Sequence, residues 1–62
     1  MNFFEYKNKV KERVMEMEGC DSTTADSMLD RWSDTIRDEF SEDATDDDAD
    51  YTAKEIVCYD IG

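Results

Sequence analysis

Apolar residues recur every three or four positions over the first eighteen residues. This spacing is that of one helical face, and it predicts a helix over about 2–18. We expect Asn2 to cap this helix by accepting from the amide of Glu5, and Gly19 to end it in the left-handed conformation. The apolar positions of this first helix are Phe3, Tyr6, Val10, Val14 and Met17.

A second periodic run predicts another helix over about 23–40. Thr23, followed three residues later by Asp26, is expected to cap it. Because the connection at 20–22 is short, the two helices should form an antiparallel hairpin, and this hairpin is the predicted core. The apolar positions of the second helix are Ala25, Met28, Leu29, Trp32, Ile36 and Phe40.

The last third of the chain allows two interpretations. Ser and Asp are poor in helix interiors, so 41–47 is expected to be a connection whose end caps the next element. Residues 55–61, EIVCYDI, have the composition of a strand, but neither preceding helix offers a strand a partner. We therefore predict a short helix over 48–59, packing through Ala49, Ala53, Ile56 and Val57. Tyr51, Cys58 and Ile61 are expected to contribute less.

The predicted fold class is thus all-α, a small helical bundle formed by one domain of 62 residues. The chain has 18 acidic and 7 basic residues, with a formal net charge of −11. Such a charge disfavours direct contact with nucleic acid or an anionic membrane and attracts basic partners. The first ten residues lack a signal-peptide pattern and no apolar run is long enough to span a bilayer, so a cytoplasmic location is expected. Cys20 and Cys58 are expected to be free thiols, at least partly buried.

The negative charge is concentrated after the first helix. Residues 1–18 carry equal numbers of acidic and basic side chains, whereas 38–50 hold eight carboxylates and no basic residue. On the predicted second helix, Asp26, Asp30, Asp34 and Asp38 recur every fourth residue and should form one acidic ridge that continues into this segment. A solvated helix face followed by a disordered acidic linker is the competing interpretation.

The sequence contains none of the common catalytic or ligand-binding motifs in complete form. It contains no histidine, no glycine-rich loop and no Cys-x-x-Cys pair, so we expect neither an enzyme nor a cofactor. Asp46, Asp48 and Asp50 imitate the opening of an EF-hand loop, but Tyr51 stands where that loop needs glycine and Val57 where it needs a glutamate. A shortened calcium loop over 46–55, closed by Glu55, is a minor alternative.

The spacing of the carboxylates can be compared with that of phosphates. The eight charges of 38–50 correspond to one per ~2.4 Å if helical and one per roughly 5 Å if extended. Duplex DNA carries one per about 1.7 Å of axis and a single strand one per about 3.4 Å. In size, charge and lack of catalytic residues, the chain resembles small acidic helical proteins of phages and mobile elements that imitate DNA. This resemblance is one of composition, and it implies inhibition by occupying a basic channel.

The first functional hypothesis is therefore a DNA-mimic inhibitor whose partner is a nuclease, a restriction or CRISPR effector, or a DNA-binding regulator. The alternative is a small interaction module, antitoxin-like or an adaptor, that uses apolar side chains such as Phe4, Met15 or Trp32 for a partner or a homodimer. The acidic residues predicted to contact the partner are Asp26, Asp30, Asp34, Asp38, Glu39, Glu42, Asp43, Asp46, Asp47, Asp48 and Asp50.

Overall fold

The computed structural model describes residues 1–61 and contains four helices in this range, with no strand. The predicted all-α bundle is therefore confirmed. The helices are α1 (Phe3–Glu18), α2 (Ser22–Arg31), α3 (Ser33–Glu39) and α4 (Asp46–Ile61).

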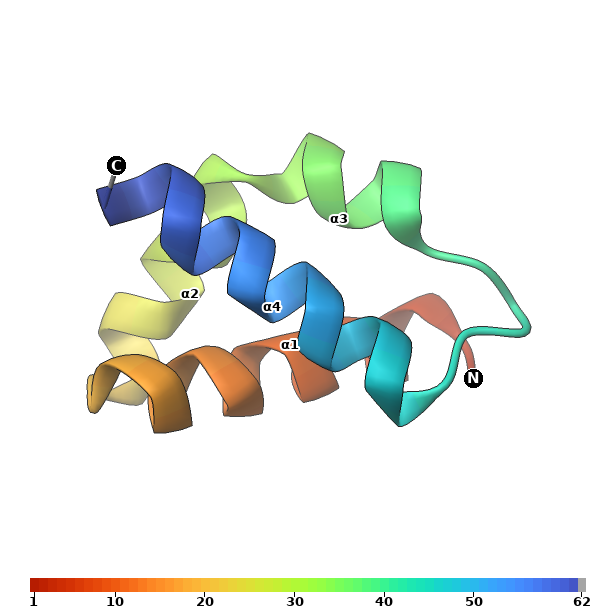
Figure 1. The fold of residues 1–62 in the computed structure, drawn as a ribbon, viewed down its shortest axis with the longest axis horizontal. Helices are drawn as coiled ribbons and strands as arrows, with labels where there is room; N and C mark the ends of the chain where they lie inside the picture. The colour runs from red at the N-terminus through yellow and green to blue at the C-terminus, as the bar shows by residue number, and fades with distance from the viewer. Residues whose placement is uncertain (62) are drawn as a thin grey trace.

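The first three helices follow three sides of an open frame, and α4 crosses this frame diagonally (Figure 1). α4 starts near the N-terminal end of α1 and ends at the corner between α2 and α3. The most extensive helix contact joins α1 to α4, whereas α1 meets α2 less closely. The hairpin of the first two helices is therefore not the main core contact. Small residues at Ala49 and Ala53 explain the difference, since they let α4 approach α1 closely.

One hydrophobic cluster fills the space between the helices, and every helix contributes to it. Phe40, just beyond α3, packs edge-on against Phe3 and Tyr6 of α1, with ring centroids 5.3 and 5.5 Å apart. This contact closes the frame, because it joins the end of α3 to the start of α1. The fully or almost fully buried apolar residues are Tyr6, Val10, Val14, Ala25, Met28, Leu29, Ile36, Ala44, Ala49, Ala53 and Ile56.

The ends of α1 are formed as its sequence predicts. The Asn2 side chain accepts a hydrogen bond from the Glu5 amide over 2.8 Å. Gly19 has φ 62° and ψ 29°, and its N–H donates to the Met15 carbonyl. Met17, however, is exposed, whereas Met15 packs on the core.

The predicted single helix over 23–40 is wrong, because it breaks at Trp32. This residue has φ −111° and ψ 28°, outside the helical region, although hydrogen bonds of the helical type continue on both sides of it. A straight helix of this length would extend about 27 Å, as long as the whole molecule, and would carry Phe40 away from α1. The break instead turns α3 along α4, and the Trp32 indole packs on the core.

The cap of α2 also differs from the prediction. Asp21, not Thr23, caps the helix by accepting from the Thr24 amide over 2.9 Å. This hydrogen bond lowers the pKa of Asp21 below its ordinary value. Since Asp, Ser and Thr are all good N-cap residues, the run Asp21–Thr24 offers several adjacent starts, and the helix uses the first of them.

The last element is a helix, so the strand interpretation of 55–61 is excluded. It is longer than the predicted 48–59, and the connection before it is shorter than 41–47. Ala49, Ala53 and Ile56 are buried as expected and Val57 is partly so. Cys58 is exposed and not partly buried, since its position on α4 faces away from α1.

We predict that Ile56→Ala destabilises the protein by about 2–4 kcal/mol, because it leaves a cavity where α4 crosses α1. A chain of this size has only about 3–9 kcal/mol of stability in total, so the loss will be large in urea denaturation followed by circular dichroism. Ile61→Ala is the matched control, since Ile61 lies on the same helix but is 70% exposed. It should change the free energy of unfolding by less than about 0.5 kcal/mol. Equal losses for both variants would contradict the docking of α4.

Candidate acidic binding surface

The acidic residues proposed to contact a partner do not form one straight ridge. Asp26 and Asp30 lie on α2, whereas Asp34 and Asp38 lie on α3, which runs in a different direction beyond the break at Trp32 (Figure 1). The predicted register of one acid per helical turn is therefore interrupted between Asp30 and Asp34. The remaining acids follow along the connection 40–45 and the first turn of α4.

Three of these acids are paired with cations of the same chain. Asp26 lies 3.0 Å from Lys11 and Asp46 lies 3.8 Å from Lys9, both across the surface. Asp50 is held more firmly, because it accepts from Arg13 Nε over 2.6 Å and also contacts Lys54 at 3.1 Å. The Arg13 hydrogen bond, helped by Lys54, lowers the pKa of Asp50 below its ordinary value. These acids therefore already have a role in joining the helices.

The acidic triplet at the start of α4 has a structural explanation. Thr45 and Asp48 form a reciprocal cap, since the Thr45 amide donates to Asp48 Oδ2 over 2.9 Å and the Asp48 amide donates to Thr45 Oγ1. Asp46, Asp47 and Asp48 all lie in the first helical turn, where the helix dipole favours negative charge. Because the cap and the helix dipole explain why these three acids are adjacent, their clustering does not by itself indicate a partner.

Glu39 is partly buried and belongs to a polar contact that was not expected from the sequence. Its Oε2 accepts from Thr52 Oγ1 over 2.6 Å, and Thr52 is also hydrogen-bonded to the buried Tyr6 hydroxyl. Burial raises the pKa of Glu39, and its hydrogen bond with the Glu55 carboxyl raises it further. The signal for this contact was the hydroxyl of Thr52, which stands between Ala49 and Ile56 on the apolar face of α4.

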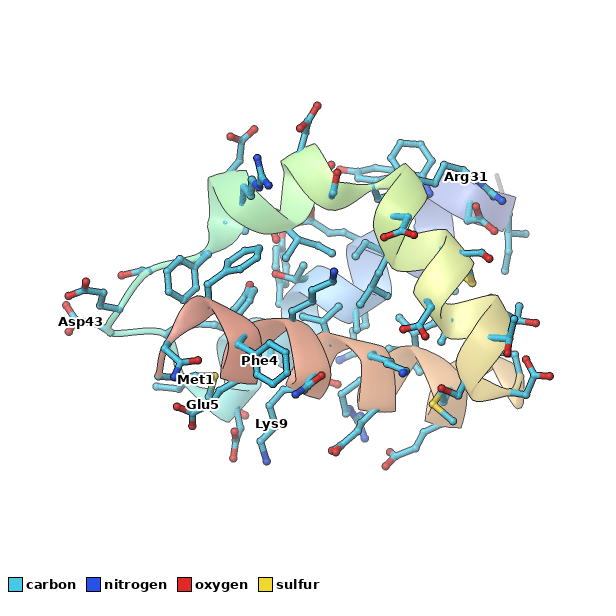
Figure 2. All side chains as sticks on the ribbon, turned by 180° about the vertical axis from the view of Figure 1, so that it is seen from behind. Met1, Phe4, Glu5, Lys9, Arg31 and Asp43 are labelled. Carbon is cyan, nitrogen blue, oxygen red and sulfur yellow. The ribbon has the colours of Figure 1, made fainter. Side chains whose placement is uncertain are left out.

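Apart from Asp48, which caps α4, six acids of the proposed set are exposed and form no ion pair within residues 1–61. Asp43 is at the outermost point of the connection and points away from the helices (Figure 2). Asp30 and Asp38 stand in the last turns of α2 and α3, where the helix dipole disfavours negative charge. The six unpaired acids are Asp30, Asp34, Asp38, Glu42, Asp43 and Asp47.

The folded chain holds its charge at a density close to that of nucleic acid. Its Cα atoms extend 27 Å along the longest axis, and the formal net charge is −11. The ratio is one net negative charge per about 2.5 Å, between the values for duplex and single-stranded DNA. The docking of α4 produces this density, because it brings the end of the acidic segment back onto the body of the molecule.

The segment 46–55 does not form the loop that calcium binding would require. These residues lie in α4, where alternate side chains point in different directions and cannot converge on one ion as they do in an EF-hand loop. Nor do any three acidic or cysteine side chains in the described part of the chain gather as metal ligands do. Among residues 1–61, no helix has the length and apolar character needed to cross a bilayer.

Comparisons with protein-family models, with curated proteins and with solved structures find no match for this chain.

We predict that Asp50→Asn lowers the thermal midpoint at pH 7, because it removes the bridge from α4 to Arg13. The pKa of Asp50 is lowered in the folded protein, so its contribution is present above the ordinary value of 3.8 and disappears as the pH falls through the lowered value. The difference from wild type should therefore shrink between pH 4 and pH 2 in thermal scans. Asp43→Asn makes the same charge change without losing an ion pair, and it should show no such loss at pH 7.

Proposed function

We propose that this protein is a DNA-mimic inhibitor that occupies the basic nucleic-acid-binding surface of a target protein. The observation that carries the proposal is the set of six exposed acids that have neither an intramolecular cation nor the capping role of Asp48. Two of them, Asp30 and Asp38, stand at helix ends where negative charge opposes stability. A requirement for stability alone would not favour acids at these positions, whereas a basic partner would.

The proposed contact surface runs from the end of α2 along α3 and the connection to α4. Asp30 lies in the last turn of α2, Asp34 and Asp38 on α3, Glu42 and Asp43 on the connection, and Asp47 on the first turn of α4. These segments follow one another along one edge and one end of the molecule (Figure 1). In this hypothesis their carboxylates take the positions of phosphates, and arginine side chains grip them with two parallel hydrogen bonds each.

The partner is a nuclease, a restriction or CRISPR effector, or a DNA-binding regulator in the cytoplasm, with a channel lined by Arg and Lys. Since the protein replaces DNA in that channel, its affinity should fall with salt as that of DNA does. Asp26, Asp46 and Asp50 contribute less to this surface, because Lys11, Lys9 and Arg13 already neutralise them.

A second candidate function has support from one side chain. Phe4 is 72% exposed on α1 and points outward (Figure 2). An adaptor that docks through apolar contacts would use such a residue and would need the acids only for solubility. The other residues named for this function are less available, because Trp32 packs against Tyr59 and Met15 against the core.

The proposed function predicts a partner that short duplex DNA releases. The immobilised protein is incubated with a host lysate at low salt, and the bound proteins are eluted with duplex DNA at constant ionic strength. A DNA-binding protein should appear in this eluate. Its affinity, measured afterwards with purified components, should fall steeply with salt. A captured partner that withstands both DNA and salt, and that Phe4→Ala abolishes, would instead establish the adaptor.

The contact surface is tested with two variants of equal charge. Asp38→Asn with Asp43→Asn removes two unpaired acids from the proposed surface, whereas Glu12→Gln with Glu16→Gln removes two acids from α1. The first variant should weaken binding about tenfold or more. It should also reduce the slope of log K against the logarithm of the salt concentration by about two. The second should leave both unchanged. Equal effects of the two variants would mean that only net charge matters, and the proposed surface would be wrong.

A further inference from the structure

Two tyrosines are exposed on one side of α4. Tyr51 is 63% exposed and Tyr59 is 51% exposed. Glu55 lies midway between them in the sequence, one helical turn from each, so the three residues share a side of the helix. The two tyrosines are about 12 Å apart along the helix axis. We call Tyr51, Glu55 and Tyr59 the tyrosine–glutamate face, since it presents a carboxylate between two aromatic rings.

The Tyr59 end of this face is held in place. The centroid of the Tyr59 ring lies 5.5 Å from that of Trp32, at the corner between α2 and α3 where α4 ends (Figure 1). Asp60 fixes this corner, because it accepts from Trp32 Nε1 over 3.3 Å and is also paired with Arg31. The Tyr59 hydroxyl donates to Glu55 Oε2 over 3.4 Å. The ring and the carboxylate are therefore oriented before a partner binds, which lowers the entropy lost on binding.

Glu55 has no cationic partner within residues 1–61, because none of the ion pairs in this range includes it. The neighbouring Lys54 contacts Asp50, and Arg31 at the corner contacts Asp60. A positive charge at the tyrosine–glutamate face would therefore come from another molecule.

Packing within the protein does not account for the whole face. The contact with Trp32 explains Tyr59 in part. Tyr51, in contrast, is not among the residues packed on the hydrophobic cluster, and it forms no aromatic pair in the described part of the chain. The ring of Tyr51 is therefore available to a partner.

An aromatic ring beside a carboxylate has the chemistry of a site for an organic cation. A positive charge within ~6 Å of the centroid of a tyrosine ring is attracted by the electrons of that ring. Arginine suits such a face better than lysine, because its planar guanidinium stacks on a ring and donates two parallel hydrogen bonds to a carboxylate. A lysine ammonium is a compact point charge without this planar geometry.

We propose that the tyrosine–glutamate face binds an arginine side chain of a partner protein. The guanidinium stacks on a tyrosine ring and donates to the Glu55 carboxylate, which Tyr59 orients. The net charge of −11 attracts a partner that presents such a side chain. This inference goes beyond the proposed function, because it assigns a site outside the six unpaired acids and does not require the partner to bind DNA.

The test uses two peptides of equal charge, acetyl-Gly-Gly-Arg-Gly-Gly-amide and the same peptide with lysine in place of arginine. Each is titrated into the ¹⁵N-labelled protein at low salt, and chemical shifts are followed at the Trp32 indole N–H and at the backbone amides. The arginine peptide should shift the signals of 51–60 and bind about threefold or more tighter than the lysine peptide. Equal affinities of the two peptides, or shifts concentrated along 34–47, would overturn the proposal.

Four variants show whether the face itself is responsible. Tyr51→Leu removes an exposed ring and Glu55→Gln removes the carboxylate, and each should weaken binding of the arginine peptide about two- to fivefold or more. Phe4→Leu and Glu42→Gln are the matched controls, since they make similar changes at exposed positions on α1 and in the connection before α4. Both controls should bind the peptide as wild type does.

The same spectra report whether each variant is folded, and the comparison of the two peptides on the wild-type protein needs no variant. If the controls weaken binding as much as Tyr51→Leu and Glu55→Gln do, the peptide responds only to net charge and the proposed site is wrong. Because no DNA-binding protein takes part in these titrations, their outcome is independent of whether the protein imitates DNA.

Discussion

The crossing of α4 over α1 is the contact on which the rest of the structure depends. It buries Ala49, Ala53 and Ile56 of α4 beside Tyr6, Val10 and Val14 of α1. A chain of 62 residues with a net charge of −11 has little apolar area and much self-repulsion, so one close contact must supply much of its stability. The same crossing brings Arg13 to Asp50 and Tyr6 to Thr52. Packing, charge pairing and the buried polar chain therefore have a common origin.

The positions of the helices follow from local patterns, but their mutual arrangement does not. Asn2, Gly19 and the four-residue spacing of Tyr6, Val10 and Val14 are enough to define α1. Trp32 continues the apolar spacing from Leu29 to Ile36, and neither glycine nor proline marks a break there, so the sequence predicts one long helix. The break arises because α3 gains more by packing along α4 and by returning Phe40 to α1 than by continuing straight.

For the candidate surface, too, the sequence predicts the local features but not the contacts between distant residues. The segment 38–50 stands out in the sequence, and the structure confirms the docked helix that keeps its charges close together. Which of its acids have partners depends on the crossing of α4 over α1, because Arg13, Lys9 and Thr52 lie far from their acidic partners in the sequence. Counting carboxylates along the chain therefore overestimates the number available to a partner.

The roles of the individual acids explain how so acidic a chain can fold. Asp21 and Asp48 cap helices, Asp50 joins α4 to α1, and Asp46 and Asp47 suit the dipole at the start of α4. These acids replace, in part, the apolar area that a small domain lacks. Asp30 and Asp38 have no such role, and they oppose the dipoles of the helices that carry them. Because stability does not account for them, they carry more weight than the denser triplet at 46–48 in the argument for a basic partner.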